Sequence, residues 1–165
     1  MGMKLINEMK LSVLSLFFLL SMSSCMVVTI PANLGKTIIG HENICDGDLY
    51  GAGEEGLEAQ QIIIESQEEL ELLLDKMSSI NPTNCSDILM TIDFNEYDLI
   101  FLLDRVRGSG GHSIQVTEVI KLDNLVSVEY KHQAPTGMTT TVLTQPFQFV
   151  QVLKLNSEVS FVISE

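Results

Sequence analysis

The residue types that could perform catalysis gather around a glycine-rich segment, residues 105–112. Ser109 and His112 lie three residues apart, and Asp104 directly precedes the segment, which supplies the residue types of a nucleophile, a base and a carboxylate. A triad is recognised by geometry, however, and this segment lies between two predicted strands. A nucleophilic serine of the hydrolase type sits on a strand–turn–helix elbow, which the pattern does not predict. We therefore expect no catalytic residue and no enzyme activity.

Metal and cofactor sites are also not expected. The three histidines are scattered along the chain: His41, His112 and His132. Four acidic residues gather within the acidic segment 46–58: Asp46, Asp48, Glu54 and Glu55. They lack the spacing of a calcium-binding loop, so a solvated acidic face is the better interpretation.

The glycine-rich segment is the first candidate for binding. A phosphate loop would need a helix N-terminus after it, and here a strand follows. Glycines permit positive φ and close backbone approach, so one reading is a flexible hairpin connection and the other is an exposed loop that docks on a partner. The candidate contact residues are Gly108, Ser109, Gly110, Gly111 and His112.

The second candidate is the segment Gln145, Pro146 and Phe147, which follows a threonine-rich run. Proline donates no ladder hydrogen bond and restricts the residue before it, so we expect the segment to break a strand and to present Phe147 at a fixed angle. The alternative is that Phe147 is a core residue.

The elements that would position these segments are mostly strands. Ser66 and Glu69 form a capping box, and apolar residues follow at helical spacing (Leu70, Leu73, Leu74, Met77), which predicts one helix. Apolar runs or period-two alternation predict about seven strands, around residues 62–64, 99–103, 113–117, 125–130, 139–143, 147–153 and 159–163. The expected fold is mainly β (α+β): an antiparallel β-sandwich or partly open barrel with one helix packed on it.

The N-terminus has the pattern of an exported protein. Residues 1–24 combine Lys4 and Lys10, a short apolar run and small residues, which is typical of a signal peptide. Met22-Ser23-Ser24-Cys25 resembles a bacterial lipobox, which predicts lipid on Cys25; the alternative is a soluble secreted protein. Residues 25–60 are then expected to be a tether and an acidic, glycine-rich lead-in, and 61–165 the β domain.

The remaining cysteines, Cys45 and Cys85, form an even pair if Cys25 carries lipid. Exported proteins reach an oxidising compartment, so we expect a Cys45–Cys85 disulfide, with two buried thiols as the alternative.

The charge restricts the partners. The formal net charge of −13 becomes −14 when residues 1–24, with two Lys and one Glu, are removed. Such a domain is repelled by nucleic acid phosphates and by anionic lipid headgroups, so no nucleic acid partner is expected and the lipid would be the only membrane contact.

Four short pieces together resemble the C-terminal domain of the protease-complex subunit PrcB family. They are Ile64-Glu65-Ser66, Ile92-Asp93-Phe94, residues 109–114 and residues 144–147. The resemblance begins at Ile62 and implies an accessory lipoprotein subunit associated with a surface serine-protease complex. His112 stands where many members have Tyr.

The leading hypothesis is therefore a non-catalytic binding module at a bacterial cell envelope, on its periplasmic face or its surface, with a protein partner that the resemblance suggests is a protease. The glycine-rich and proline–aromatic segments also resemble the wedge loops of chagasin-like cysteine-protease inhibitors, so inhibition is a second hypothesis. A small-ligand or glycan binder is a third, although the chain has no Trp and only three Tyr to form an aromatic platform.

Overall fold

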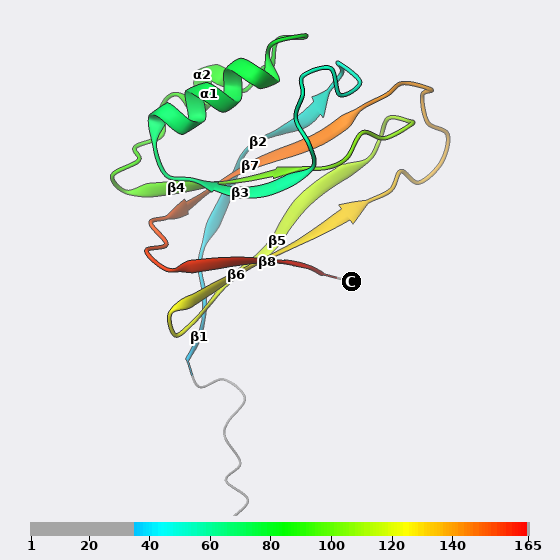
Figure 1. Cartoon of the computed structure of the whole chain (residues 1–165). Helices are drawn as coiled ribbons and strands as arrows, with labels where there is room; N and C mark the ends of the chain where they lie inside the picture. The colour runs from blue at the N-terminus through cyan, green and yellow to red at the C-terminus, as the bar shows by residue number, and fades with distance from the viewer. Residues whose placement is uncertain (1–34, 165) are drawn as a thin grey trace, which may run out of the picture. The chain divides into compact units, whose positions relative to one another are not determined.

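The computed structural model describes residues 35–164, which contain eight strands and two short helices (Figure 1). In chain order these are β1 (Lys36–Ile38), β2 (His41–Leu49), β3 (Gln60–Ile64), α1 (Gln67–Met77), α2 (Ser86–Leu89), β4 (Tyr97–Leu103), β5 (Ser113–Leu122), β6 (Leu125–Gln133), β7 (Gln145–Leu153) and β8 (Glu158–Ile163). In these residues no helix is long and apolar enough to cross a bilayer.

The strands form two four-stranded sheets. The outer sheet has the order β1-β5-β6-β8, and the inner sheet has the order β2-β7-β4-β3. All neighbouring strands are antiparallel except β6 and β8, which are parallel because the chain crosses to the inner sheet as β7 before it returns. The predicted mainly β sandwich is confirmed. It has eight strands and two helices in place of the expected seven and one.

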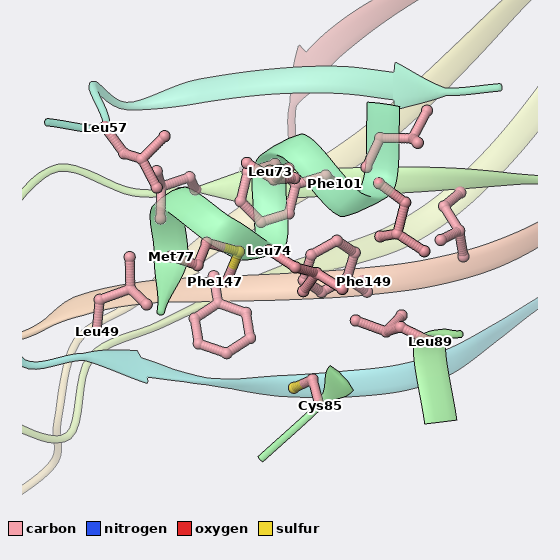
Figure 2. Close-up of a cluster of buried hydrophobic side chains, with 14 residues drawn as sticks. Leu49, Leu57, Leu73, Leu74, Met77, Cys85, Leu89, Phe101, Phe147 and Phe149 are labelled. Atoms are coloured by element: carbon pink, nitrogen blue, oxygen red, sulfur yellow. The ribbon is translucent and has the colours of Figure 1, made fainter. Parts of the chain in front are cut away.

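The central strands of the inner sheet, β4 and β7, are buried on both faces along most of their length. Figure 2 shows Phe101, Phe147 and Phe149 packed on the face that α1 covers. Ile100 and Val150, one residue along each strand, point to the other face and meet the apolar residues of the outer sheet. Continuous apolar runs are typical of strands with both faces covered. The architecture is therefore three layers: helices, inner sheet and outer sheet.

Helix α1 forms where its sequence predicts it. The Ser66 hydroxyl accepts a hydrogen bond from the Glu69 amide at 3.3 Å, and the Glu69 carboxylate accepts one from the Glu65 amide at 2.9 Å. The four apolar residues at helical spacing are buried: Leu70, Leu73, Leu74 and Met77. The short helix α2 was not predicted, since four residues are too few to show a helical period.

The folded body begins earlier than the sequence predicts. The tether and lead-in were expected to extend through residue 60, but β1 pairs with β5 and β2 pairs with β7 over most of its length. Asp46, Gly47 and Asp48 have low strand propensity, and their conformation is set by pairing with β7, about a hundred residues further along the chain. The predicted signal peptide and the lipidation site Cys25 lie outside the described residues.

The predicted Cys45–Cys85 disulfide is confirmed, with a Cα–Cα distance of 5.9 Å. It joins β2, an edge strand of the inner sheet, to the segment between α1 and α2. Figure 2 shows Cys85 beside β2, below the aromatic residues of the core. The bond thus holds the helical layer to one edge of the inner sheet.

Replacing both cysteines by serine should lower the free energy of unfolding by about 4 kcal/mol, because the unfolded chain gains entropy when a cross-link over a sequence separation of 40 residues is removed. Denaturant unfolding of the oxidised wild type and of the double variant measures this difference. Reduced wild-type protein is the matched control and should resemble the variant. Equal stability of the oxidised wild type and the variant would contradict the expectation.

Candidate functional site

Three connections meet at one end of the sandwich. Strands β2 and β4 run in the same direction and finish opposite the start of β7, where Leu49 pairs with Gln145 and Leu103 with Phe147. Strand β6 finishes at the same end, opposite the first residue of β5. We call the resulting surface the loop end; it comprises residues 50–59, 104–112 and 134–144. Figure 1 shows these loops together on the right of the molecule.

The loop end is held by a buried carboxylate at the end of β4. Asp104 is only 3% exposed, and it accepts hydrogen bonds from the Arg105 amide and from Arg107 Nε, both at 2.7 Å. Arg107 Nη2 lies 2.6 Å from the same carboxylate, and His132 Nδ1 lies 3.4 Å from it. Charge-assisted contacts of this kind are the stronger hydrogen bonds in proteins, so Asp104 fixes the start of the glycine-rich segment.

Arg107 extends this anchor to the β6–β7 loop. Its amide donates to the Thr144 carbonyl at 2.7 Å, and the Thr144 amide donates back to the Arg107 carbonyl at 3.2 Å. The Thr144 hydroxyl donates to the Ser109 carbonyl at 3.1 Å. The two loops therefore form one connected unit.

The glycines permit this contact between loops. A Cβ atom on Gly110 would lie 2.7 Å from the Thr140 hydroxyl, and one on Gly111 would lie 3.0 Å from Pro135. Gly111 also has φ of +81°, which an L side chain adopts only with strain. The close approach predicted for the glycine segment is thus made to another loop of the same chain. Gly108 and Gly111 remain exposed, and Ser109 and His112 are half-buried.

Ser109 and His112, which lie three residues apart in the sequence, contact each other. Ser109 Oγ lies 3.2 Å from His112 Nε2, within the reach of a nucleophile–base pair. Asp104, the third candidate, contacts Arg107 and His132 instead. In residues 35–164 no carboxylate is hydrogen-bonded to His112, so the pair lacks the orienting group of a triad and closes the loop on itself.

The prediction that Gln145, Pro146 and Phe147 form a contact surface is wrong. All three are buried, because they begin β7, which lies between β2 and β4. Gln145 Nε2 donates to the carbonyls of Leu57 and Asp104 at 3.0 and 2.9 Å, and so links two loops of the loop end. Phe147 packs edge-on against Phe149 with ring centroids 6.0 Å apart, as the core alternative proposed.

The exposed apolar residues lie just before this segment. Residues 139–143 were predicted to be a strand, but they are irregular and pack beside the glycine segment. Met138 is fully exposed, and Val142 and Leu143 are 37% and 48% exposed. The proline and glycine at 135 and 137 were the available signals of a turn before this segment.

The four acidic residues of segment 46–58 do not all lie on one solvated face. Glu55 is buried and accepts a hydrogen bond from the Gly51 amide at 2.7 Å, so it closes a turn and does not face solvent as expected. Asp46 is exposed on β2. Across the described range, no three His, Cys, Asp or Glu side chains gather where they could hold a metal ion.

Asp48, near the end of β2, has a carboxyl group whose pKa is shifted by its surroundings. Burial raises the pKa of the Asp48 carboxyl above its usual 3.8, and the Thr144 side chain and nearby His112 oppose the shift without cancelling it. One carboxyl oxygen, Oδ1, is buried with no hydrogen-bond partner in the described part of the chain. The folded state therefore favours the neutral acid more than the unfolded state does.

Comparison with known protein families finds a match to part of the chain. Residues 102–152 match the family model described as PrcB C-terminal, which confirms the resemblance. The matched region runs from the end of β4 through β7, and it contains the glycine segment and the exposed β6–β7 loop. No curated protein and no solved structure matches the chain.

Replacing Asp48 by Asn should stabilise the domain at neutral pH, because an ionised carboxylate at this position is disfavoured by burial. Because burial raises the pKa of Asp48 in the folded state, ionisation of this carboxyl lowers the stability of the wild type as pH rises through the folded-state pKa. The stability advantage of the Asn variant should therefore shrink as pH falls and vanish below pH 3.8. Denaturant unfolding across this pH range measures the difference. A difference that is constant with pH would show that packing, and not ionisation, sets the effect.

Proposed function

We propose that the chain is a non-catalytic accessory module of a protease complex, held at a bacterial envelope by lipid on Cys25. The observation that carries the proposal is the match of residues 102–152 to the PrcB C-terminal family, whose name refers to a subunit of such a complex. The signal-peptide and lipobox patterns support the location. The contacts of Asp104, which binds Arg107 and His132 and is not hydrogen-bonded to His112 within residues 35–164, support a binding role over a catalytic one.

The contact surface in this proposal is the loop end. Three exposed apolar side chains, Met138, Val142 and Leu143, lie in the β6–β7 loop, which packs against the glycine segment at Gly110 and Gly111. Apolar side chains that lose water on binding supply most of the affinity of a protein interface, and methionine adapts to irregular surfaces. The network around Asp104 holds the loops in place before binding, which lowers the entropy lost on association.

A second candidate function is protease inhibition. The observation that favours it is that three loops, residues 50–59, 104–112 and 134–144, are gathered at one end of a sandwich and could enter a cleft together. Incubation of the purified domain with papain-type and subtilisin-type proteases separates the two functions. Loss of protease activity would favour inhibition, whereas intact activity with stable complex formation would favour the accessory role.

Replacing Leu143 by Asp should abolish the recovery of the partner, because a charge would then be placed in the apolar centre of the contact. The measurement is affinity purification from detergent-solubilised envelopes of the native cell, followed by mass spectrometry. We expect the co-purifying protein to fall by about tenfold or more. The proposal also requires that the protein is recovered in the envelope fraction and that mass spectrometry finds an acyl chain on Cys25.

The matched control is Leu153→Asp. Leu153 is 61% exposed, compared with 48% for Leu143, and lies at the far end of β7, so it tests a charge on an exposed leucine outside the loop end. Both variants should retain the melting temperature of the wild type. Undiminished recovery with Leu143→Asp, or equal loss with both variants, would refute the proposed surface.

A further inference from the structure

The inner sheet has one edge that is open and one that is covered. At the β2 edge, a bulge between Asn43 and Cys45 interrupts the ladder, and the disulfide holds residues 81–85 beside the strand. At the other edge, β3 pairs with β4 without a bulge and contains neither proline nor lysine. Sheet edges normally carry such features because they prevent pairing with other chains. Strand β3 lacks them.

The outer backbone groups of β3 are available for pairing. In an antiparallel pair every second residue directs its N–H and C=O away from its partner strand. Residues 60–64 make no backbone or side-chain hydrogen bond apart from those to β4, as far as the described chain extends. Figure 2 shows β3 at the rim of the sheet, with β4, β7 and β2 following in order.

An apolar groove runs beside this open edge. Its volume is about 370 Å³, and it lies between β3 and α1. Ile62 and Ile64 form its floor with Leu57, and Leu72 and Leu73 form its wall. Leu72 is 60% exposed, although the other leucines of α1 are buried. A strand added to β3 would place every second side chain in this groove.

The charges around the groove determine what kind of strand fits. Glu58 precedes β3 and Glu65 follows it, and Glu68 and Glu69 begin the adjoining helix; all four are exposed. Lys76 is the basic residue among the groove-lining positions. A second copy of this chain would bring the same acidic groups together and add its own net charge of −13, so self-pairing at this edge is opposed.

We propose that the β3 edge and its groove bind an extended segment of a partner protein in which apolar and basic residues alternate. The segment adds a fifth strand to the inner sheet. Its main chain pairs with the outer groups of β3, its apolar side chains enter the groove against Leu72, and its basic side chains, which point to the opposite face, bring positive charge to an edge flanked by exposed glutamates. This surface lies beside α1 and shares only Leu57 and Glu58 with the loop end; it contains none of the three exposed apolar side chains proposed there, and it does not depend on the function proposed above.

The test uses the purified protein with a labelled seven-residue peptide of alternating Val and Lys. Fluorescence anisotropy measures binding, and NMR amide shifts locate it. We expect saturable binding with shifts in residues 60–64, and about tenfold weaker binding after Leu72→Gln, which removes an apolar contact without changing charge. The same peptide with N-methylated backbone amides should not bind, because it cannot form the ladder.

Two variants serve as controls. Ile88→Gln, at an exposed position of α2, and Leu143→Asp, at the loop end, should both bind the peptide like the wild type. Unchanged binding after Leu72→Gln, or equal binding of the N-methylated peptide, would show non-specific attraction to an acidic surface and overturn the proposal. Concentration-dependent dimerisation with the same amide shifts would overturn the choice of occupant.

Discussion

The pairing of β4 with β7 is the interaction on which the rest of the structure depends. These strands lie at the centre of the inner sheet, in register from Tyr97↔Leu153 to Leu103↔Phe147, and they are buried on both faces. One face supports the helices through Phe101 and Phe149, whose ring centroids are 4.7 Å apart. The other face supports the outer sheet. Burial of apolar side chains is the dominant favourable term in folding. The loops that connect the strands contribute less to this core, so their sequence and conformation can vary.

Buried polar side chains attach the periphery to this centre. At one end of β4, Asp98 accepts hydrogen bonds from Lys154 Nζ and the Leu155 amide at 2.7 and 2.9 Å. Between the sheets, Gln148 Oε1 accepts a hydrogen bond at 2.7 Å from the Val116 amide, beside a bulge in β5. Asp98 and Gln148 thus accept hydrogen bonds from donors that are partly or fully withdrawn from solvent, where an unpaired donor would cost free energy. The loop end is attached in the same way through Asp104 and Gln145.

The sequence predicts what depends on local pattern. The capping box locates α1, and the apolar run at 99–103 locates the centre of the inner sheet. Strand β2 was missed because its conformation comes from pairing with β7, and the apolar residues of β2 do not alternate regularly. Phe147 was predicted to lie on a surface, but it is buried at the start of β7. Its burial depends on the neighbouring strands β2 and β4, which are distant in sequence, and the local sequence pattern does not show it. The glycine segment was located correctly, but its contact with residues 134–144 could not be read from spacing.

Residue-level hydrogen exchange tests the central claim most directly. If the rest of the structure depends on the β4–β7 pair, the ladder amides of Ile100, Phe101 and Phe149 exchange only through global unfolding. Their free energy of exchange then equals the free energy of unfolding measured with denaturant. Amides of α2 and β8 then exchange through smaller openings. Exchange of the β4 and β7 amides as fast as that of α2 or β8, under conditions where the domain is folded, would contradict the account.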